Sequence, residues 1–387
     1  MEEAQYFSLL ICVLYVKKGM RKYMKRDPAI EMARIIACLM VIGVHTCLST
    51  SINGIYEFYR VVIACFIADG VAIFWLISGC FLFNKSSYKK LVLHTVKNII
   101  IPMCIFSIFS FYLSDWLIGG TTLKESIIHT KEEYLSILKG ILVWTNPVNY
   151  GGHLWYLYAY LLVILIFPIL KAFVTYLDSD IRYIKCFMLI SFIFLILNDI
   201  SGNKLAQFSH HSINALVPAS LYTIWGHIIY KYRNHFVNKK YAISFGVIFI
   251  GLNIIRASIQ FRRYNAVEFN DSILYWFSSI GIVCSISVII FCLSMIKENK
   301  KNNSIIYKLA SGTFLVYLVH PLVIAIIQKY DYQNKLYEYC QRHIVMGWMS
   351  DVIYTFIIIG IVFILSFIIS GIIIKIKSLF CYLKGKN

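Results

Sequence analysis

The stretch Glu31-Met-Ala-Arg34-Ile-Ile-Ala-Cys-Leu-Met-Val-Ile-Gly-Val-His45 decides the fold of this chain. It is apolar apart from an acid, a guanidinium and an imidazole, and it lies in a run long enough to cross a membrane. Eleven helical steps bring Arg34 and His45 back to nearly the same face, about 16 Å apart along the axis. Polar groups inside a membrane are costly and are candidates for function. We therefore expect these two side chains to mark a path through the protein.

The whole chain has the composition of a polytopic membrane protein. Of its 387 residues 59% are hydrophobic and 14% are charged, whereas soluble domains are about half apolar and about a quarter charged. We therefore predict an all-α fold, a membrane bundle of about ten transmembrane helices. Their expected ranges are 30–50, 58–83, 94–118, 154–174, 183–199, 213–231, 240–257, 273–296, 307–328 and 352–376.

The distribution of basic residues predicts the topology. With the N-terminus in the cytoplasm, 24 of the 37 Lys and Arg residues fall in inner connections and 11 in outer ones, among them Arg60 and Arg256. This asymmetry follows the positive-inside rule with both termini cytoplasmic. The net charge of +18 could indicate nucleic acid, but the basic residues lie in short connections without interleaved stacking aromatics, so no nucleic-acid partner is expected. The longest connection, residues 119–153, is predicted on the outer side.

The eleven cysteines are scattered, mostly through the apolar segments, with no Cys-x-x-Cys pair. We expect neither a disulfide framework nor a metal site from this pattern. Buried thiols of this kind usually act as small apolar residues.

His45 is the candidate general base, because an imidazole titrates near neutrality and can accept a proton from an attacking hydroxyl. Asp69 in the second predicted helix is its candidate orienting partner, since both lie at about the same depth in the membrane. A purely structural, hydrogen-bonded role remains open for each residue.

Arg34 offers a planar, permanently charged group to phosphate or carbonyl oxygens. Four lysines follow in sequence near the same membrane face, and a cationic vestibule of this kind suits a polyanionic ligand such as coenzyme A. The candidate donor-binding residues are Arg34, Lys85, Lys89, Lys90 and Lys97. The lysines could equally set topology alone, and Arg34 could be a helix-start charge paired with Glu31.

Three further passages follow in order along the chain: Phe74-Trp-Leu-Ile-Ser-Gly-Cys-Phe-Leu82, His153-Leu-Trp-Tyr-Leu157 and Ser311-Gly-Thr-Phe-Leu-Val-Tyr-Leu-Val-His-Pro321. Together with Arg34-x10-His45 they resemble the motifs of the integral-membrane acyltransferase-3 family, which includes O-acetyltransferases of cell-surface polysaccharides. Trp75 and Cys80 depart from the family pattern. Lys97 also departs from it, because it is the only permanent charge at a place where relatives usually carry arginines. This difference predicts weaker binding of the donor phosphates.

The resemblance implies an acyltransferase domain over residues 28–378, preceded by a basic, cytoplasmic or interfacial segment (1–27) and followed by a basic tail (379–387). It implies acyl-CoA, foremost acetyl-CoA, as the donor substrate, a carbohydrate acceptor, a multi-pass location in the cytoplasmic membrane and neither a metal nor a permanently bound cofactor. Acceptor binding would fall to Ser78, His153, Trp155, Tyr156, Tyr317 and His320, with Ser78 and Tyr317 also candidate donors to the oxyanion.

Two other function classes fit a bundle with buried ionisable residues. A transporter or flippase of polysaccharide precursors would use the same features, although no internal repeat is detectable. A membrane sensor would have little use for the aligned Arg34 and His45. The acceptor, the acyl chain length and a homo-oligomeric state stay open at this level.

Overall fold

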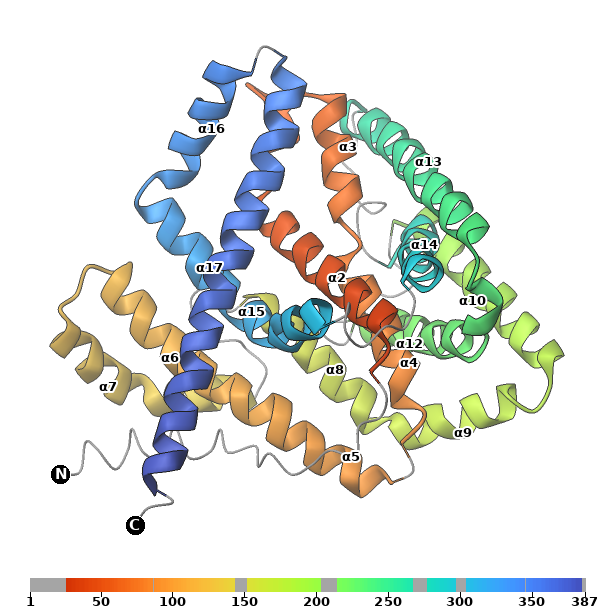
Figure 1. Ribbon diagram of the computed structural model, residues 1–387, viewed down its shortest axis with the longest axis horizontal. Coiled ribbons are helices and arrows are strands. Elements are labelled where there is room, and N and C mark those ends of the chain that lie inside the picture. The colour runs from red at the N-terminus through yellow and green to blue at the C-terminus, as the bar shows by residue number, and fades with distance from the viewer. Residues whose placement is uncertain are drawn as a thin grey trace.

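The computed structural model is built almost entirely from helices (Figure 1). It describes residues 26–85, 87–142, 152–202, 214–266, 277–296, 304–344 and 346–384. Within these residues the only sheet is a hairpin in which β1 (Ser51–Ile52) pairs antiparallel with β2 (Ile55–Tyr56). The chain is thus an all-α protein. Most of the expected N-terminal segment, the last three residues of the tail and the passage Asn146-Pro-Val-Asn149 lie outside the described residues.

Each of the ten segments predicted from hydropathy contains a helix or a helix pair. The helices are α2 (Pro28–Thr46), α3 (Phe58–Ile67), α4 (Gly70–Leu82), α5 (Tyr88–Thr95), the π-helix η1 (Val96–Ile100), α6 (Ile101–Leu117), α7 (Leu123–Leu142), α8 (Trp155–Leu165), α9 (Phe167–Leu177), α10 (Ile181–Ile200), α12 (Leu216–Lys231), α13 (Lys239–Tyr264), α14 (Ser279–Met295), α15 (Ser304–Lys329), α16 (Tyr332–His343) and α17 (Gly347–Lys384). Short 3₁₀ turns lie at η2 (Gly152–Leu154) and η4 (Arg233–Phe236).

Seven helices or continuous helix runs in the described residues are long and apolar enough to cross a membrane, and up to eight if the bent pair α8 and α9 is one span. The expected count of ten is not confirmed. Two predicted spans fall short because α12 has 16 residues and α14 has 17, whereas a full crossing takes about 20. A third predicted span consists of α8 and α9, which meet at 67°. Helices α3 and α4 are separated by a short break near Asp69 but still count as one span, Phe58–Leu82.

Two connections contain helices that hydropathy did not predict, α7 within the expected loop 119–153 and α16 between α15 and α17. Helix α7 begins with a capping box. The Glu125 amide donates to the Thr122 hydroxyl at 3.3 Å, and the Thr122 amide donates to the Glu125 carboxylate at 2.8 Å. This reciprocal pair satisfies two amides that a helix start leaves free, so a helix forms although its faces are too polar to span.

Helix α2 lies in the middle of the bundle (Figure 1) and contacts α4, α14, α15 and α17. It starts with Asp27 as N-cap, whose carboxylate accepts from the Ala29 amide at 3.0 Å, and with Pro28 in the first turn. Small residues let neighbours approach: a Cβ added to Gly70 at the start of α4 would lie 2.7 Å from the Ala37 carbonyl oxygen. The helix that carries Arg34 and His45 therefore packs with its backbone directly against α4.

Glycines also bring α4 and α12 into backbone contact. A Cβ on Gly79 would overlap the carbonyl of Thr223, and a Cβ on Gly226 would overlap the carbonyl of Leu76. Neither obstacle is a flexible side chain that could turn away. The Ser78-Gly79 motif of the sequence thus has a packing role, since only a residue without a Cβ fits at this crossing.

Gly79→Ala should therefore destabilise the protein, by about 1–3 kcal/mol or more, because α4 and α12 must separate to admit the methyl group. Gly251→Ala on α13 is the matched control, since a Cβ there meets nothing within 4 Å and alanine is the better helix former. The measurement is the thermal midpoint of each variant in the same detergent. Equal midpoints for Gly79→Ala and the wild type would contradict the packing role.

Candidate active site

Three histidines that are far apart in sequence meet within the helix bundle. His45 lies in the last turn of α2, His153 in η2 just before α8, and His320 in α15. The ring centroid of His320 lies 5.3 Å from that of His45 and 5.3 Å from that of His153. His320 and His153 are buried, whereas His45 is exposed. The cluster thus presents one accessible imidazole backed by two buried ones.

Tyrosines continue this cluster from the histidines toward α4. The Tyr317 ring lies 5.1 Å from the His153 ring, and the Tyr317 hydroxyl donates to the His153 carbonyl oxygen. The Tyr156 ring follows at 6.0 Å from Tyr317, and the Trp75 ring at 4.7 Å from Tyr156. The residues predicted at the acceptor side therefore form one contiguous wall with His45.

The two remaining predicted acceptor-side residues lie at the edge of this wall. Trp155 packs edge-on against Tyr156, with centroids 6.4 Å apart. The Ser78 hydroxyl donates to the Phe74 carbonyl oxygen at 2.9 Å and also interacts with the Tyr156 side chain. Because the hydroxyl hydrogens of Ser78 and Tyr317 are both engaged, either must leave its present acceptor to stabilise an oxyanion.

Asp69 has a different partner from the one its depth suggested. Its carboxylate lies at the break between α3 and α4, and the Arg256 Nη1 of α13 lies 3.0 Å from both carboxylate oxygens. Both side chains are fully buried. The ring contact of His45 is with His320, so the predicted orienting role of Asp69 has no matching contact in the described structure. The physical reason is azimuth: a depth match says nothing about which way a side chain points.

Sequence reasoning missed Arg256, which it counted as a charge of an outer connection. Helix α13 does not end near residue 257 but continues to Tyr264, so Arg256 lies within it. A signal was present: Asn253, Arg256 and Gln260 are spaced by three and four residues, and all three are fully buried. Polar residues at this spacing share one helix face and indicate a buried polar contact.

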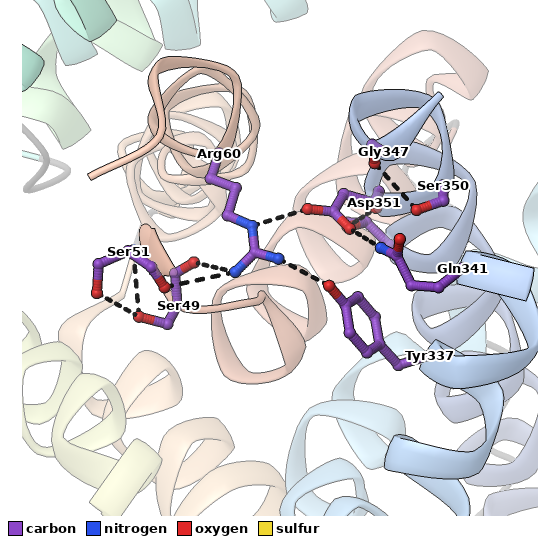
Figure 2. Close-up of polar contacts among 9 residues, drawn as sticks. Ser49, Ser51, Arg60, Tyr337, Gln341, Gly347, Ser350 and Asp351 are labelled. Atoms are coloured by element: carbon purple, nitrogen blue, oxygen red, sulfur yellow. Dashed lines mark hydrogen bonds and ion pairs between the residues drawn. The ribbon is translucent and has the colours of Figure 1, made fainter. Parts of the chain in front are cut away.

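Arg60 near the start of α3 is the centre of a second buried polar network (Figure 2). Its Nε lies 2.7 Å from Asp351 Oδ2 on α17, and its Nη1 donates to the Ser49 carbonyl oxygen at 3.1 Å. Its Nη2 donates to the Tyr337 hydroxyl of α16 at 2.9 Å. Gln341 of α16 donates to the other oxygen of Asp351 at 2.8 Å. Each guanidinium nitrogen and each carboxylate oxygen of this ion pair thus has a polar partner, which offsets its desolvation.

This network joins the two segments that leave the histidine cluster. Residues 47–51 follow His45, and α16 follows the helix that carries His320. Arg60 binds both and also α17. Arg60 was also counted as an outer connection charge, and it lies instead in the first turn of a helix with 7% of its surface exposed. We expect the network to hold the two helix ends at a fixed separation.

The other end of α2 carries the predicted donor-side residues. Arg34 Nη1 lies 3.3 Å from Glu31, and the same carboxylate binds Arg26 at 3.0 Å. Two guanidiniums share one carboxylate, so this group keeps a net positive charge. Lys85 follows α4 and is half-buried, and the exposed lysines of α5 and η1 are Lys89, Lys90 and Lys97. Their side chains thus lie on the surface of the helix bundle.

A charged cluster lies at the loop between α9 and α10. Asp178 binds His227 Nε2 at 3.0 Å and Lys231 Nζ at 2.9 Å, both on α12. Burial alone would raise the pKa of Asp178, but the hydrogen bonds from Lys231 and His227 lower it overall. The pair ties α12 to the end of α9 and leaves Asp178 ionised near neutral pH.

The described residues contain no group of three or more His, Cys, Asp or Glu arranged to hold a metal ion. Long apolar helices, and a cluster of histidines and tyrosines in which only His45 is exposed, define a polytopic membrane protein with a candidate acid–base site. The sequence model of the acyltransferase-3 family, described as an acyltransferase domain, matches residues 27–371. The match covers nearly the whole chain, so this protein belongs to the acyltransferase-3 family and is a multi-pass membrane acyltransferase. The comparisons with curated proteins and with solved structures gave no match.

Proposed function

We propose that this membrane acyltransferase transfers an acetyl group from cytoplasmic acetyl-CoA to a hydroxyl of a cell-surface or lipid-linked carbohydrate, with His45 as the general base. The observation that supports this role is the exposed imidazole of His45 against the buried rings of His320 and His153. An acyltransferase needs a proton acceptor that substrate can reach, and the exposure of this histidine supports that role. The site lies wholly within the part of the chain that the family matches.

The reaction needs only one proton acceptor. As the acceptor oxygen attacks the thioester carbon, the hydroxyl proton passes to a ring nitrogen of His45. The tetrahedral intermediate then breaks its carbon–sulfur bond, and His45 returns the proton to the sulfur. The products are the ester and coenzyme A as a free thiol, and the imidazole is neutral again. A transient acyl-enzyme is the other route to the same products.

The donor is proposed to enter at the end of α2 that carries Arg34. That end is cytoplasmic in the topology predicted from the basic residues. Lys85 follows the end of α4, and the proposal places it and the lysines after it at the same end of the bundle as Arg34. Coenzyme A carries phosphates, which a cluster of exposed cations attracts and concentrates. About 16 Å of helix then separates Arg34 from His45, a length that an extended thioester arm would have to cover.

Replacing Lys85, Lys89 and Lys90 together by glutamine should raise the KM for acetyl-CoA about fivefold to tenfold at low salt and leave kcat unchanged, because the lysines bind phosphate away from the reacting atoms. The difference should shrink as salt is added, since exposed charges are screened. The control carries Lys239→Gln and Lys240→Gln, which change two cations at the start of α13. An unchanged KM in the triple variant would remove these lysines from the donor site.

The decisive experiment follows free coenzyme A. Purified protein in detergent, without a membrane gradient, receives labelled acetyl-CoA and oligosaccharide acceptors, and thiol release and labelled ester are measured. Wild-type protein should release coenzyme A and label the acceptor, and His45→Ala should do neither.

A transporter of glycan precursors is the second candidate, because the described spans include two that are interrupted, α3/α4 and α8/α9, as in many transporters. That function predicts no thiol release in the same experiment. Release of coenzyme A by wild-type protein would exclude a function limited to transport, and its absence with every acceptor would contradict the proposed function.

A further inference from the structure

Pro321 lies in the interior of α15, directly after His320. In a helix the amide of residue 321 would donate to the carbonyl of Tyr317, but proline has no N–H. The Tyr317 carbonyl therefore lacks its backbone donor. The His320 side chain supplies one instead, with Nδ1 2.8 Å from the Tyr317 carbonyl oxygen and 3.3 Å from that of Val316.

This contact fixes the tautomer of His320. A carbonyl oxygen only accepts hydrogen bonds, so Nδ1 must carry the hydrogen, and the neutral ring then has its lone pair on Nε2. His320 is fully buried, and its Nε2 has no hydrogen-bond partner among the described residues. A buried acceptor without a donor is costly and calls for an explanation.

His153 and His45 lie equally close to His320, but only His45 is exposed and has room to turn, so it is the donor. Its ring centroid lies 5.3 Å from that of His320, with the ring planes at 44°. Two imidazoles joined by one N–H···N bond of about 3 Å have centroids about 5 Å apart, so a rotation of the exposed His45 ring suffices to form it. The other nitrogen of His45 would then carry its lone pair toward the open side of the site.

We propose that His320 is the positioning residue of His45 and that Pro321 sets this role by keeping the Tyr317 carbonyl free for Nδ1. The inference rests on the proposed function of His45 as the base. In the reaction His45 keeps its N–H directed at His320 Nε2, and its second nitrogen takes the proton of the acceptor hydroxyl and returns it to the departing sulfur. His320 gains and loses no proton, and its lone pair stabilises the imidazolium that forms on His45.

A purely structural role of His320 predicts the opposite order of activities for two substitutions, His320→Asn and His320→Gln. His320→Asn keeps an N–H donor near the position of Nδ1 but has nothing at the position of Nε2. His320→Gln places an amide near the position of Nε2 and loses the donor to Tyr317. A positioning role predicts a kcat about 100-fold below wild type for His320→Asn and a smaller loss for His320→Gln. A structural cap predicts that His320→Asn keeps more activity than His320→Gln, and that order would overturn the proposal.

Pro321→Ala provides the second test. It restores the amide at residue 321, which competes for the Tyr317 carbonyl and releases the tautomer of His320. We expect kcat to fall about tenfold, with the KM for acetyl-CoA unchanged and a thermal midpoint equal to or above that of the wild type, because alanine favours a helix interior over proline. Wild-type turnover in this variant would contradict the role of Pro321.

A third measurement tests the tautomer of His320 without depending on turnover. Nitrogen NMR of protein with ¹⁵N-labelled histidine distinguishes N–H from lone-pair nitrogens, with His320→Asn used to assign the signal. His320 should show Nδ1–H in the wild type and a mixture of tautomers in Pro321→Ala. If His45→Gln keeps normal turnover, the proposed function fails while the tautomer result stands on its own. If His45→Gln is inactive but His320→Asn turns over faster than His320→Gln, only the positioning role fails.

Discussion

Replacing His45 by alanine should lower kcat for acyl transfer by about 10²–10⁴-fold while the protein stays folded. The loss corresponds to general base catalysis by a positioned side chain. His45 is exposed at the last turn of α2, so its removal leaves no buried partner unsatisfied in the helix itself. The measurement is steady-state release of coenzyme A, together with the thermal midpoint of the variant.

The control for this variant is His343→Ala, which removes an exposed imidazole from the end of α16. It should keep wild-type turnover and stability. Both variants lose one histidine. A difference between their kcat values therefore reflects the position of His45 and not the loss of an imidazole as such. Normal kcat in His45→Ala would remove His45 from the mechanism.

Breaking the Asp69–Arg256 pair should give the largest loss of stability. Both side chains are fully buried, and removing one partner of such a pair costs about 3–5 kcal/mol because the other charge stays unpaired. Arg256→Met and Asp69→Leu should each lower the free energy of unfolding by this amount. The double variant should recover much of the loss, since well-packed apolar residues often replace a buried pair at little cost.

The measurement is a double-variant cycle on unfolding in mixed detergent, with Arg342→Met as control. Arg342 pairs with Glu338 on α16 at 2.9 Å, and both are exposed, so its loss should cost well under about 1 kcal/mol. Additive losses in the double variant would show that the two buried groups do not depend on each other. Because Asp69 immediately precedes Gly70, which rests on α2, the single variants should also reduce kcat.

The sequence predicted the helical fold better than the contacts between side chains. Apolar runs located helices because hydropathy depends on composition within a window. The start of α2 at Pro28 rather than residue 30 follows from the cap at Asp27. The count of ten spans was not confirmed, because α12 and α14 are apolar but short and because length in sequence does not reveal a bend such as that between α8 and α9.

Residues from three separate sequence motifs meet in space. His45, His153 and His320 come together although nothing in their sequence spacing measures distance. The partner of Asp69 could not be read in the same way, since Arg256 seemed to lie beyond a helix end. The helical spacing of Asn253, Arg256 and Gln260 was the available signal, and the capping box at Thr122 was the corresponding signal for α7.

The place of His45 in α2 has a consequence for the electrostatics of catalysis. Helix α2 ends at Thr46, so His45 occupies its final turn, where unpaired carbonyls form the negative end of the helix dipole. The positive charge that His45 acquires on accepting a proton arises at that end and gains about 0.3–1 kcal/mol, or more in a partly buried setting. The neutral imidazole that first meets the substrate gains far less. The macrodipole thus favours the transition state over the bound substrate and contributes to kcat rather than to affinity.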